Sequence, residues 1–366
     1  MKKFTKILLI GCLLVTVSCN NWLDVDPKSQ VKDKDLFASE MGFKEALSGV
    51  YSLMTKEGLY GKELTFGWLG VLGQEWTSVP YNYEDDQKYD FENAASEVRI
   101  DSVWTGLYNA IANANKLLKE LEGKENLFSG DNYSIIKGEV LALRAYLHFD
   151  LLRIFGASCA VGMERIAIPY VTEYAPTIFP QEKVGDFVGK VLKDLQDAAK
   201  CLENDPILTG RTVSEIDDNG YLMNRQVHLN YYAVKGLMAR VYLYKGDYAN
   251  AEVCAKEVIG SGCFEWVKQE NLTNESVADL TFSTEHLFAL NIVTLGNIVD
   301  KYLDGGNNSF ALEESRLSEY YGSSYDYRYL YLFKTGVGMS NTLRYLKKYD
   351  QLESVSWAQS YRNKLP

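Results

Sequence analysis

The chain is poor in the residues and motifs that build familiar active sites. It has three histidines among 366 residues and no HExxH, GxSxG, Walker or GxGxxG pattern. His148 lies in an apolar helical stretch, which favours a packing role, while His228 and His286 stand alone. These absences argue against an enzyme that depends on a zinc ion, a bound nucleotide or an activated nucleophile.

Positive charge is also scarce. The 38 Lys and Arg residues stand against 49 Asp and Glu residues, which gives a formal net charge of -11. This balance argues against a nucleic-acid partner, because a phosphate backbone needs a basic face. An acidic protein is also repelled by an anionic membrane surface, so any attachment to a membrane must be covalent or apolar.

Long apolar runs are absent, but the N-terminus carries a short one. In residues 1–18, three lysines precede a nearly unbroken apolar run at residues 7–15, which is typical of a secretory signal peptide. The run is far shorter than the roughly 20 residues that span a bilayer. Cys19 follows in a context that resembles a bacterial lipobox, so we expect Cys19 to be lipidated and residues 19–35 to form the tether. An ordinary soluble exported protein is the alternative.

The cysteines beyond Cys19 show no CxxC or Cys/His metal spacing. Cys254 and Cys263 are close enough for a local disulfide, because two glycines between them permit a turn. Buried free thiols are the alternative for Cys159, Cys201 and Cys254, which lie among apolar or helical residues.

Helical periodicity dominates the first two thirds of the chain. Apolar residues recur at helical spacing after an expected Ser39 N-cap and again after an expected Asp101 or Ser102 N-cap. Residues 138–156 are apolar almost all round and must lie in a core. Further helices are predicted at residues 185–205 and, as a pair, at residues 229–262.

The predicted helix pair has the spacing of a tetratricopeptide repeat. Ala239, Tyr242, Gly246 and Ala251 follow a small-x2-Tyr-x3-Gly-x4-Ala pattern, in which small residues let two helices approach and a glycine makes the turn. The fold class is therefore mainly α, with tetratricopeptide-like helical hairpins that scaffold long irregular ligand-binding loops. Loops of such length are usually functional. They are expected at residues 57–99, 157–180, 204–228 and most of 262–366.

Aromatic residues gather in the first of these loops. A pyranose ring needs aromatic platforms for its C–H faces and polar side chains for its hydroxyls, and residues 65–99 supply both. Trp68 is expected to anchor this loop to the scaffold. We expect Trp76, Tyr81 and Tyr83 to stack on a sugar, and Asn82, Asp85, Gln87 and Arg99 to bond its hydroxyls. Anchoring of the loop to the scaffold is the alternative for Trp76 and Tyr83.

A second aromatic cluster occupies residues 316–333, and tyrosine is abundant in the whole chain, with 26 Tyr against 15 Phe. Tyrosines alternate from Tyr325 to Tyr331, so a strand would place all four on one face. That face would be either a stacking ledge for a glycan or an aromatic seam against the scaffold or a protein partner. The predicted ligand residues here are Tyr320, Tyr321, Tyr325 and Tyr327.

Four sequence blocks together resemble the SusD/RagB family of outer-membrane nutrient-binding lipoproteins. They are the lipobox with "CNNWLDVDP", then "GEVLALRAYLHFDLLRIFG", then "IPYV", then "AVKGLMARVYLYKGDYANA", in that order over about residues 19–260. The resemblance implies tetratricopeptide-like hairpins, a lipid-anchored location on the outer membrane facing the cell exterior, and capture of an oligosaccharide or other nutrient without cleavage. It also implies a partner, a TonB-dependent (SusC-like) outer-membrane transporter. Residues 36–366 would form the SusD-like domain, without the C-terminal helical block that such proteins usually add.

Two other interpretations remain open. An envelope protein of tetratricopeptide type that binds other proteins would need an uninterrupted helical array, and the long aromatic loops count against it. A lipid-anchored glycoside hydrolase needs two carboxylates, for which Glu84, Asp85 and Asp86 are the candidate group. No cofactor is expected, because ordinary turns are favoured over a structural calcium site in the oxygen-rich residues 205–220 and 304–309.

Overall fold

The computed structural model describes residues 33–209, 220–306, 308–335, 342–350 and 363–366. The predicted signal peptide, Cys19 and most of the tether lie outside these residues. In the described part of the chain, no helix combines the length and the apolar character that crossing a membrane requires.

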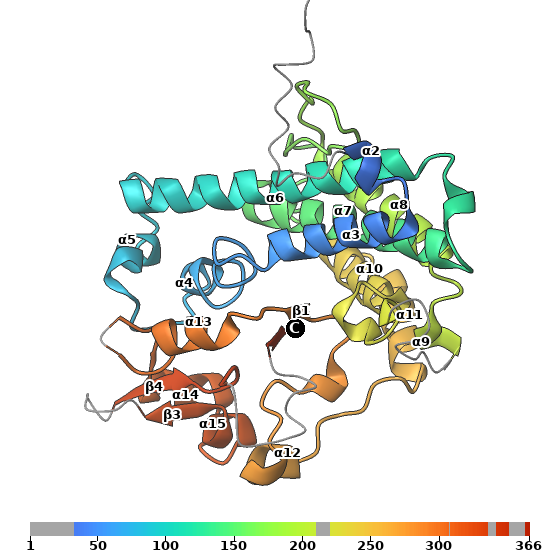
Figure 1. Cartoon of the computed structure of the whole chain (residues 1–366). Coiled ribbons are helices and arrows are strands. Elements are labelled where there is room, and N and C mark those ends of the chain that lie inside the picture. The colour runs from blue at the N-terminus through green and yellow to red at the C-terminus, as the bar shows by residue number, and fades with distance from the viewer. Residues whose placement is uncertain (1–32, 210–219, 307, 336–341, 351–362) are drawn as a thin grey trace, which may run out of the picture.

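A stack of helices forms the scaffold, and the prediction of a mainly α fold is confirmed (Figure 1). Neighbours along the chain are also neighbours in space, as in repeat proteins, since each helix packs mainly against the one before and the one after it. The helices of the stack are α3 (Glu40–Met54), α6 (Ala94–Leu121), α7 (Asn132–Phe155), α8 (Val184–Cys201), α10 (Tyr231–Lys245) and α11 (Tyr248–Gly260).

Helix α7 is central to the core, as its all-round apolar sequence predicts. Ala142, Leu143 and Ala145 point to different sides of the helix and each is fully buried. At Gly138 a Cβ atom would lie 2.8 Å from the side chain of Leu202 and 3.0 Å from that of Cys201. The glycine therefore lets α7 approach the end of α8 closely.

The chain segment at residues 168–171 packs on α7 through His148, and the predicted packing role of this histidine is confirmed. Its Nδ1 lies 2.8 Å from the carbonyl oxygen of Arg144, and the backbone N–H of Val171 donates to its Nε2 at 2.9 Å. Nε2 is therefore unprotonated and the ring neutral. Burial lowers the pKa of His148 to about 3, and Tyr170 stacks on the ring at 4.0 Å.

The helix starts follow the capping rules at positions that were only partly predicted. The Ser39 side chain accepts a hydrogen bond from the N–H of Gly42 at 3.2 Å, as expected. The prediction of a cap at Asp101 or Ser102 is wrong, because α6 begins at Ala94 and the Asn93 side chain caps it. The first turns of α6 are largely exposed and carry no apolar stripe that could have marked their start.

Helices α10 and α11 form the predicted hairpin. Gly246 ends α10 in the left-handed conformation, with φ 83°, and Asp247 caps α11 by accepting from the N–H of Asn250. Of the two alternatives for Cys254, the structure shows the free thiol, since neither Cys254 nor Cys263 forms a disulfide. Cys254 is buried inside α11, whereas Cys263 is exposed beyond its end.

Below this stack in Figure 1 lies a layer of short elements. A three-stranded antiparallel sheet has the order β2-β4-β3, with Leu312 opposite Arg344 and Phe333 opposite Leu346, and β1 pairs with β5. The strands are β1 (Leu290–Asn291), β2 (Leu312–Glu313), β3 (Phe333–Thr335), β4 (Leu343–Leu346) and β5 (Lys364–Leu365). Short helices occur both in this layer and beside the stack, where Figure 1 shows α2 next to α3.

The short helices of the described residues are α2 (Asp33–Leu36), α4 (Trp68–Leu72), η2 (Tyr81–Tyr83), α5 (Glu84–Gln87), η3 (Glu125–Leu127), α9 (Pro206–Thr209), η5 (Arg225–Val227), α12 (Glu270–Thr273), η6 (Glu275–Val277), η7 (Ser283–Glu285), α13 (Leu295–Tyr302), α14 (Glu314–Tyr321) and α15 (Tyr327–Tyr331).

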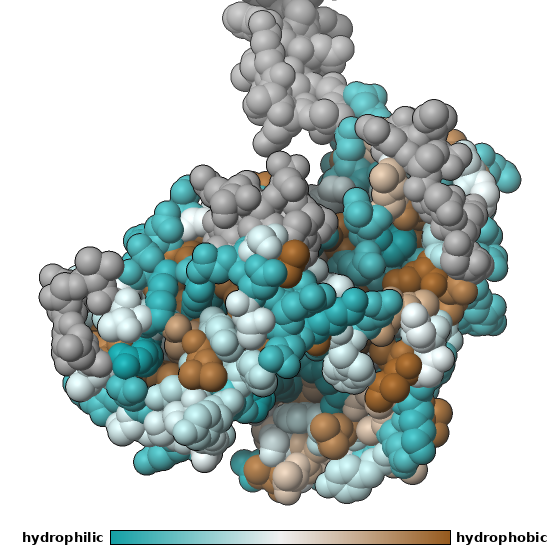
Figure 2. Space-filling view, turned by 90° about the horizontal axis from the view of Figure 1, so that it is seen from below, coloured by the Kyte–Doolittle hydropathy of each residue, from teal (hydrophilic) through white to brown (hydrophobic). Residues whose placement is uncertain are grey.

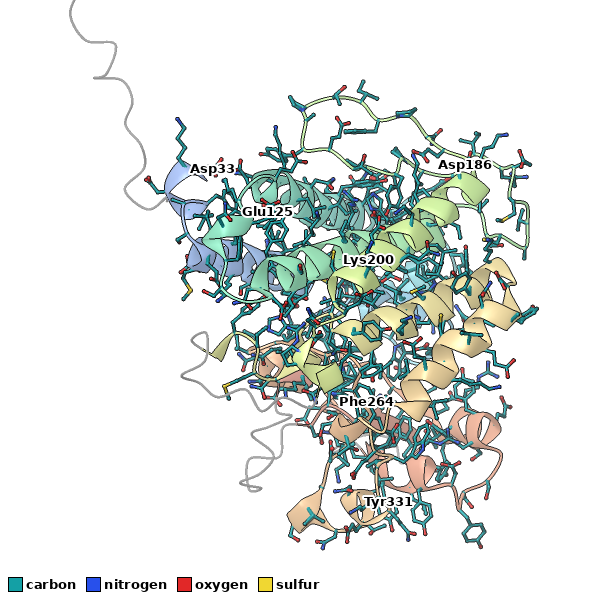
Figure 3. The ribbon with its side chains drawn as sticks, turned by 90° about the vertical axis from the view of Figure 1, so that its right-hand side faces the viewer. Asp33, Glu125, Asp186, Lys200, Phe264 and Tyr331 are labelled. Carbon is teal, nitrogen blue, oxygen red and sulfur yellow. The ribbon has the colours of Figure 1, made fainter. Side chains whose placement is uncertain are left out.

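The tyrosine-rich segment is helical, so Tyr325 to Tyr331 do not form the strand that would place all four tyrosines on one face. Asp326 caps α15 by accepting from the N–H of Arg328, which starts a helix where the alternation suggested a strand. Tyr327 and Tyr331 then share one face and stack at 5.9 Å. Figure 3 shows Tyr331 at the end of the molecule opposite Asp186 of α8.

Candidate functional site

The two aromatic segments predicted to bind a ligand meet in space. The Tyr320 hydroxyl of α14 donates to the carbonyl oxygen of Gln74 at 2.9 Å. Beside this contact, Ser78 forms an antiparallel bridge with Ala311. The loop that follows α4 is therefore fixed against β2 and α14, although more than 200 residues separate them in the sequence.

The tryptophans of the first loop are part of the core. Trp68 is 3% exposed and its Nε1 donates to Asp86 at 3.0 Å, which confirms its predicted anchoring role. Trp76 is only 5% exposed, donates from Nε1 to the carbonyl oxygen of Phe66 at 2.7 Å and packs against Phe310. The prediction that Trp76 offers a ring face to a sugar is therefore wrong.

Tyr83 and Arg99 are occupied inside the fold, so their predicted roles as ligand contacts are also wrong. Tyr83 is 1% exposed and donates to Glu63 at 2.8 Å, and the Arg99 guanidinium lies 3.9 Å from the centre of its ring. Arg99 also forms a buried ion pair with Asp86. Because Trp68 and Arg99 both bind this carboxylate, Asp86 is not free to act as one of the two carboxylates of a hydrolase.

Three of the predicted residues are accessible but stand apart from the cleft described below. Tyr81 is 79% exposed and Asn82 is also exposed. Asp85 is partly exposed and lies 3.8 Å from the ammonium group of Lys88. Gln87 instead fastens the loop, because its side chain donates to the carbonyl oxygen of Trp76 at 2.9 Å. A role for Tyr81, Asn82 and Asp85 in ligand binding stays a prediction.

A cleft of about 460 Å³ opens where the two segments meet. Tyr320 and Tyr321 of α14, Tyr349 and the largely buried Trp76 line it, together with the carboxylate residue Glu75. The sheet supplies an apolar wall. We call this the tyrosine cleft. It brings together three of the predicted residues, Trp76, Tyr320 and Tyr321, whereas Tyr325 and Tyr327 of the same cluster are exposed outside it.

Neighbouring arginines hold the rings of the tyrosine cleft in place. The Arg316 guanidinium lies 5.1 Å from the ring centre of Tyr320, which is 48% exposed. The Arg328 guanidinium lies 4.9 Å from that of Tyr321. Such cation–π contacts orient the rings, and the bond from the Tyr320 hydroxyl to the backbone fixes its outer end. The cleft is therefore lined with rings that are ordered before any ligand arrives.

Glu75 and Tyr349 border the tyrosine cleft but were not predicted. No ion-pair or hydrogen-bonding partner of the Glu75 carboxylate occurs among the described residues, and partial burial raises its pKa. Burial, together with the charge of Glu75, raises the pKa of Tyr349 to about 12. The position of Glu75 directly before Trp76, in the loop already singled out, was a usable signal. Tyr349 had none, because its segment shows no periodicity.

A second, larger cleft of about 890 Å³ shares Leu64, Thr65 and Glu75 with the tyrosine cleft. Its charged residues include Arg153 and Asp150, which form an ion pair at 3.0 Å, together with Arg240, Glu285 and Lys348. None of the residues predicted to bind a ligand lines it. Seen from below, the molecule presents a largely hydrophilic face with separate hydrophobic patches (Figure 2). Because three of the predicted residues line the tyrosine cleft and none lines the larger cleft, we take the tyrosine cleft as the candidate ligand site.

The two oxygen-rich segments in which ordinary turns were favoured over a calcium site, residues 205–220 and 304–309, are described only in part, because residues 210–219 and 307 lie outside the described part of the chain. Among the residues that are described, no group of three or more His, Cys, Asp or Glu side chains is placed to hold a metal ion. In the second oxygen-rich segment, Asp304 pairs with Lys334 at 2.8 Å.

Comparison with protein families and curated proteins gives a consistent result. A SusD-like family, described as starch-binding associating with outer membrane, matches residues 21–243. The SusD-like protein P38 of Formosa agariphila is 24% identical over 269 residues, which cover 72% of this chain and 47% of P38. The SusD-like protein P25 of the same organism is 24% identical over 43% of this chain and 31% of its own length. The chain thus spans about half the length of P38.

Solved structures share the fold. A SusD superfamily protein from Bacteroides thetaiotaomicron matches with a TM-score of 0.66 and 19% identity, over 89% of this chain and 72% of that chain. A putative sugar binding protein from Bacteroides vulgatus matches with a TM-score of 0.66 and 22% identity, over 90% of this chain and 70% of that chain. At these identities the likeness concerns the fold.

Proposed function

The chain belongs to the SusD-like family, whose description is starch-binding associating with outer membrane, and on this premise we propose that it captures oligosaccharides at the cell surface without cleaving them. The observation that carries the proposal is the tyrosine cleft. Two segments that are far apart in the sequence meet there and bring Tyr320, Tyr321 and Tyr349 together around Glu75.

The chemistry of the tyrosine cleft suits a sugar. Aromatic rings that are ordered in advance offer apolar faces to the C–H groups of a pyranose, while tyrosine hydroxyls and the Glu75 carboxylate can bond its hydroxyls. The volume of about 460 Å³ falls within the range of roughly 300–1,000 Å³ that is usual for small-molecule sites. It can hold a few sugar units of a longer chain.

Binding without cleavage is supported by the carboxylates near the cleft. Glycoside hydrolysis generally needs two carboxyl groups on either side of the scissile bond. Among the described residues, Glu75 is the one Asp or Glu side chain that lines the tyrosine cleft. The candidate group of the sequence analysis lies elsewhere, and its member Asp86 is fully buried in an ion pair.

We further propose that lipid on Cys19 anchors the protein to the outer membrane, facing the cell exterior, and that it delivers its ligand to a TonB-dependent, SusC-like transporter. The association of the family with the outer membrane supports the location. The signal sequence followed by Cys19 supports the anchor. The acidic character of the chain supports attachment by lipid rather than by charge.

The test of capture without cleavage uses the purified protein and a panel of polysaccharides and oligosaccharides. Retention is scored by affinity electrophoresis, and the incubated glycans are analysed by mass spectrometry. We expect retention by at least one glycan class and no products. Products from the wild-type protein would contradict the proposal, and the absence of retention across the panel would remove its basis.

A further inference from the structure

The charges that line the tyrosine cleft are of one sign. Glu75 contributes a carboxylate, and among the described residues no lysine, arginine or histidine lines the cleft. The rest of the lining is tyrosine, tryptophan, threonine and apolar side chains. The described residues of the site therefore offer stacking faces and hydroxyl partners but no cation that could bind a carboxylate or a sulfate.

The arginines closest to the rings do not fill that gap, because each already has a carboxylate. Arg316 contacts Glu319 at 2.7 Å. Arg328 forms a two-pronged pair with Asp326 at 2.8 and 3.1 Å. Paired guanidinium groups of this kind hold the rings, but their charge is largely neutralised locally.

Among the described residues, Arg153 and Arg240 line the larger cleft, which also contains Lys348. The ammonium group of Lys348 lies 5.6 Å from the ring centre of Tyr349 and 5.9 Å from that of Phe282. Burial lowers the pKa of Lys348, and the charge of Glu285 acts in the opposite direction. No ion pair joins Lys348 to Glu75 in the described part of the chain.

Resting on the proposed function, we propose that the tyrosine cleft selects uncharged oligosaccharides over uronate-containing or sulfated ones, with Glu75 as the specificity-determining residue. An unpaired carboxylate accepts hydrogen bonds from sugar hydroxyls but repels an anionic group placed against it. Repulsion of the unwanted ligand is a common source of specificity, because selectivity is a difference between two affinities. Burial without a compensating cation, which raises the pKa of Glu75, is consistent with a carboxylate kept for a ligand.

The test compares one glycan in two charge states. A neutral polysaccharide that the protein retains is oxidised at its C6 hydroxyls to carboxylates, and part of the product is converted to the uncharged methyl ester. Dissociation constants are measured at pH 8 for the neutral glycan, the acid and the ester. We expect wild type to bind the acid at least about tenfold more weakly than the ester, as like charges in close contact require.

Two variants assign the effect to its residue. Glu75→Gln removes the carboxylate in the cleft and is expected to bring the affinity for the acid to within about threefold of that for the ester. Glu84→Gln removes the same charge at an exposed position of α5, outside the cleft, and is expected to behave as wild type. Circular dichroism and thermal unfolding confirm that both variants are folded.

The outcomes separate the two proposals. Equal binding of acid and ester by wild type, or discrimination that survives in Glu75→Gln, would overturn the selectivity while leaving glycan capture in place. If wild type retains no neutral glycan at all, both the capture proposal and this one fail. If wild type binds the acid weakly, and Glu75→Gln but not Glu84→Gln restores the affinity for the acid, the result supports Glu75 as the specificity-determining residue.

Discussion

At the scale of single residues, an aromatic side chain near the tyrosine cleft serves either the core or the site, depending on where its polar atom is bound. Trp76 donates into the fold and packs against Phe310, which leaves 5% of it exposed. Tyr320 donates to a backbone carbonyl at the rim and keeps 48% of its surface exposed. The first stabilises the wall of the cleft, and the second is available to a ligand.

Trp76→Ala is therefore expected to lower the free energy of unfolding by about 3–5 kcal/mol, because it leaves a cavity the size of an indole ring. Urea denaturation measures the change. Trp266→Ala is the matched control, since Trp266 is 77% exposed, and a change within about 0.5 kcal/mol is expected there. Unchanged stability in Trp76→Ala together with lost ligand binding would make Trp76 a ligand platform after all.

The sequence could predict where aromatic residues concentrate but not which of them are buried. The burial of Trp76 and Tyr83 is decided by Phe310, which contacts both rings from more than 200 positions away. The role of Trp68 was predictable because its own neighbours in the sequence are apolar. Glu75 was missed although it directly precedes Trp76 in the loop already singled out, because a single acid shows no periodic pattern.

At the scale of elements, the close contact between α7 and α8 depends on a residue without a side chain. Gly138 lies in α7 where a Cβ would be 2.8 Å from Leu202 and 3.1 Å from the carbonyl oxygen of Ala198. Gly49 in α3 is exposed and has open space around its Cα. The two glycines thus have the same secondary structure but opposite surroundings.

Gly138→Ala is expected to lower the free energy of unfolding by about 1–3 kcal/mol through overpacking. Gly49→Ala should raise it by up to about 1 kcal/mol, because alanine favours the helix and no neighbour opposes it. Chemical denaturation of both variants measures the difference. Equal effects of the two substitutions would show that α7 and α8 are not in close contact at this point.

A buried charge network joins the first helix of the stack to the segment before α10. The fully buried Glu139 of α7 contacts Arg225 at 2.6 Å and His228 at 2.9 Å, and it accepts from the Tyr51 hydroxyl at 2.9 Å. Arg225 also binds Asp205 with two hydrogen bonds of 2.9 Å. Burial alone would raise the pKa of Glu139, but His228 and Arg225 outweigh it and lower the pKa to about 2.

The lowered pKa makes this network sensitive to acid. A carboxyl group whose pKa is lower in the folded state stabilises the fold above its unfolded pKa, and the stabilisation is lost as the pH falls towards the folded pKa. For Glu139 the loss is expected between about pH 5 and pH 2.

Glu139→Gln is expected to cost about 1.5–3 kcal/mol at pH 7, because it removes the carboxylate that His228 contacts and one of the two carboxylates that bind Arg225. Its stability should also depend less steeply on pH below 5 than that of wild type. Urea unfolding at pH 3, 5 and 7 measures both effects. Parallel pH profiles for the two proteins would mean that Glu139 does not keep a lowered pKa.

Helices with an apolar stripe were predictable, and elements whose start depends on a single cap were not. Periodicity located α3, α7, α8 and the α10–α11 hairpin. It missed the exposed beginning of α6, and it did not identify α15, whose five residues hold too little pattern and whose start depends on the cap at Asp326. The strands have two to four residues, too few for alternation to be recognised.

At the scale of the whole molecule, the helical stack supports a second layer of short elements that carries the tyrosine cleft (Figure 1). Residues 57–93 leave the stack between α3 and α6, and residues 262–350 follow its last hairpin, so both can meet on the same side. A protein that binds partners along an uninterrupted helical groove has no need of such a layer. The resemblance of four sequence blocks could predict the scaffold, but the pairing of the two loops is a long-range contact that no local pattern encodes.

The most direct test of glycan capture by the tyrosine cleft is the dissociation constant of a retained oligosaccharide for three proteins. They are wild type, the double variant Tyr320→Ala with Tyr321→Ala, and the control Tyr248→Ala, which removes a 70% exposed tyrosine from α11. We predict that the double variant binds at least about tenfold more weakly, because two stacking faces are lost, while the control equals wild type. Unchanged affinity in a folded double variant would contradict the account and place the ligand elsewhere.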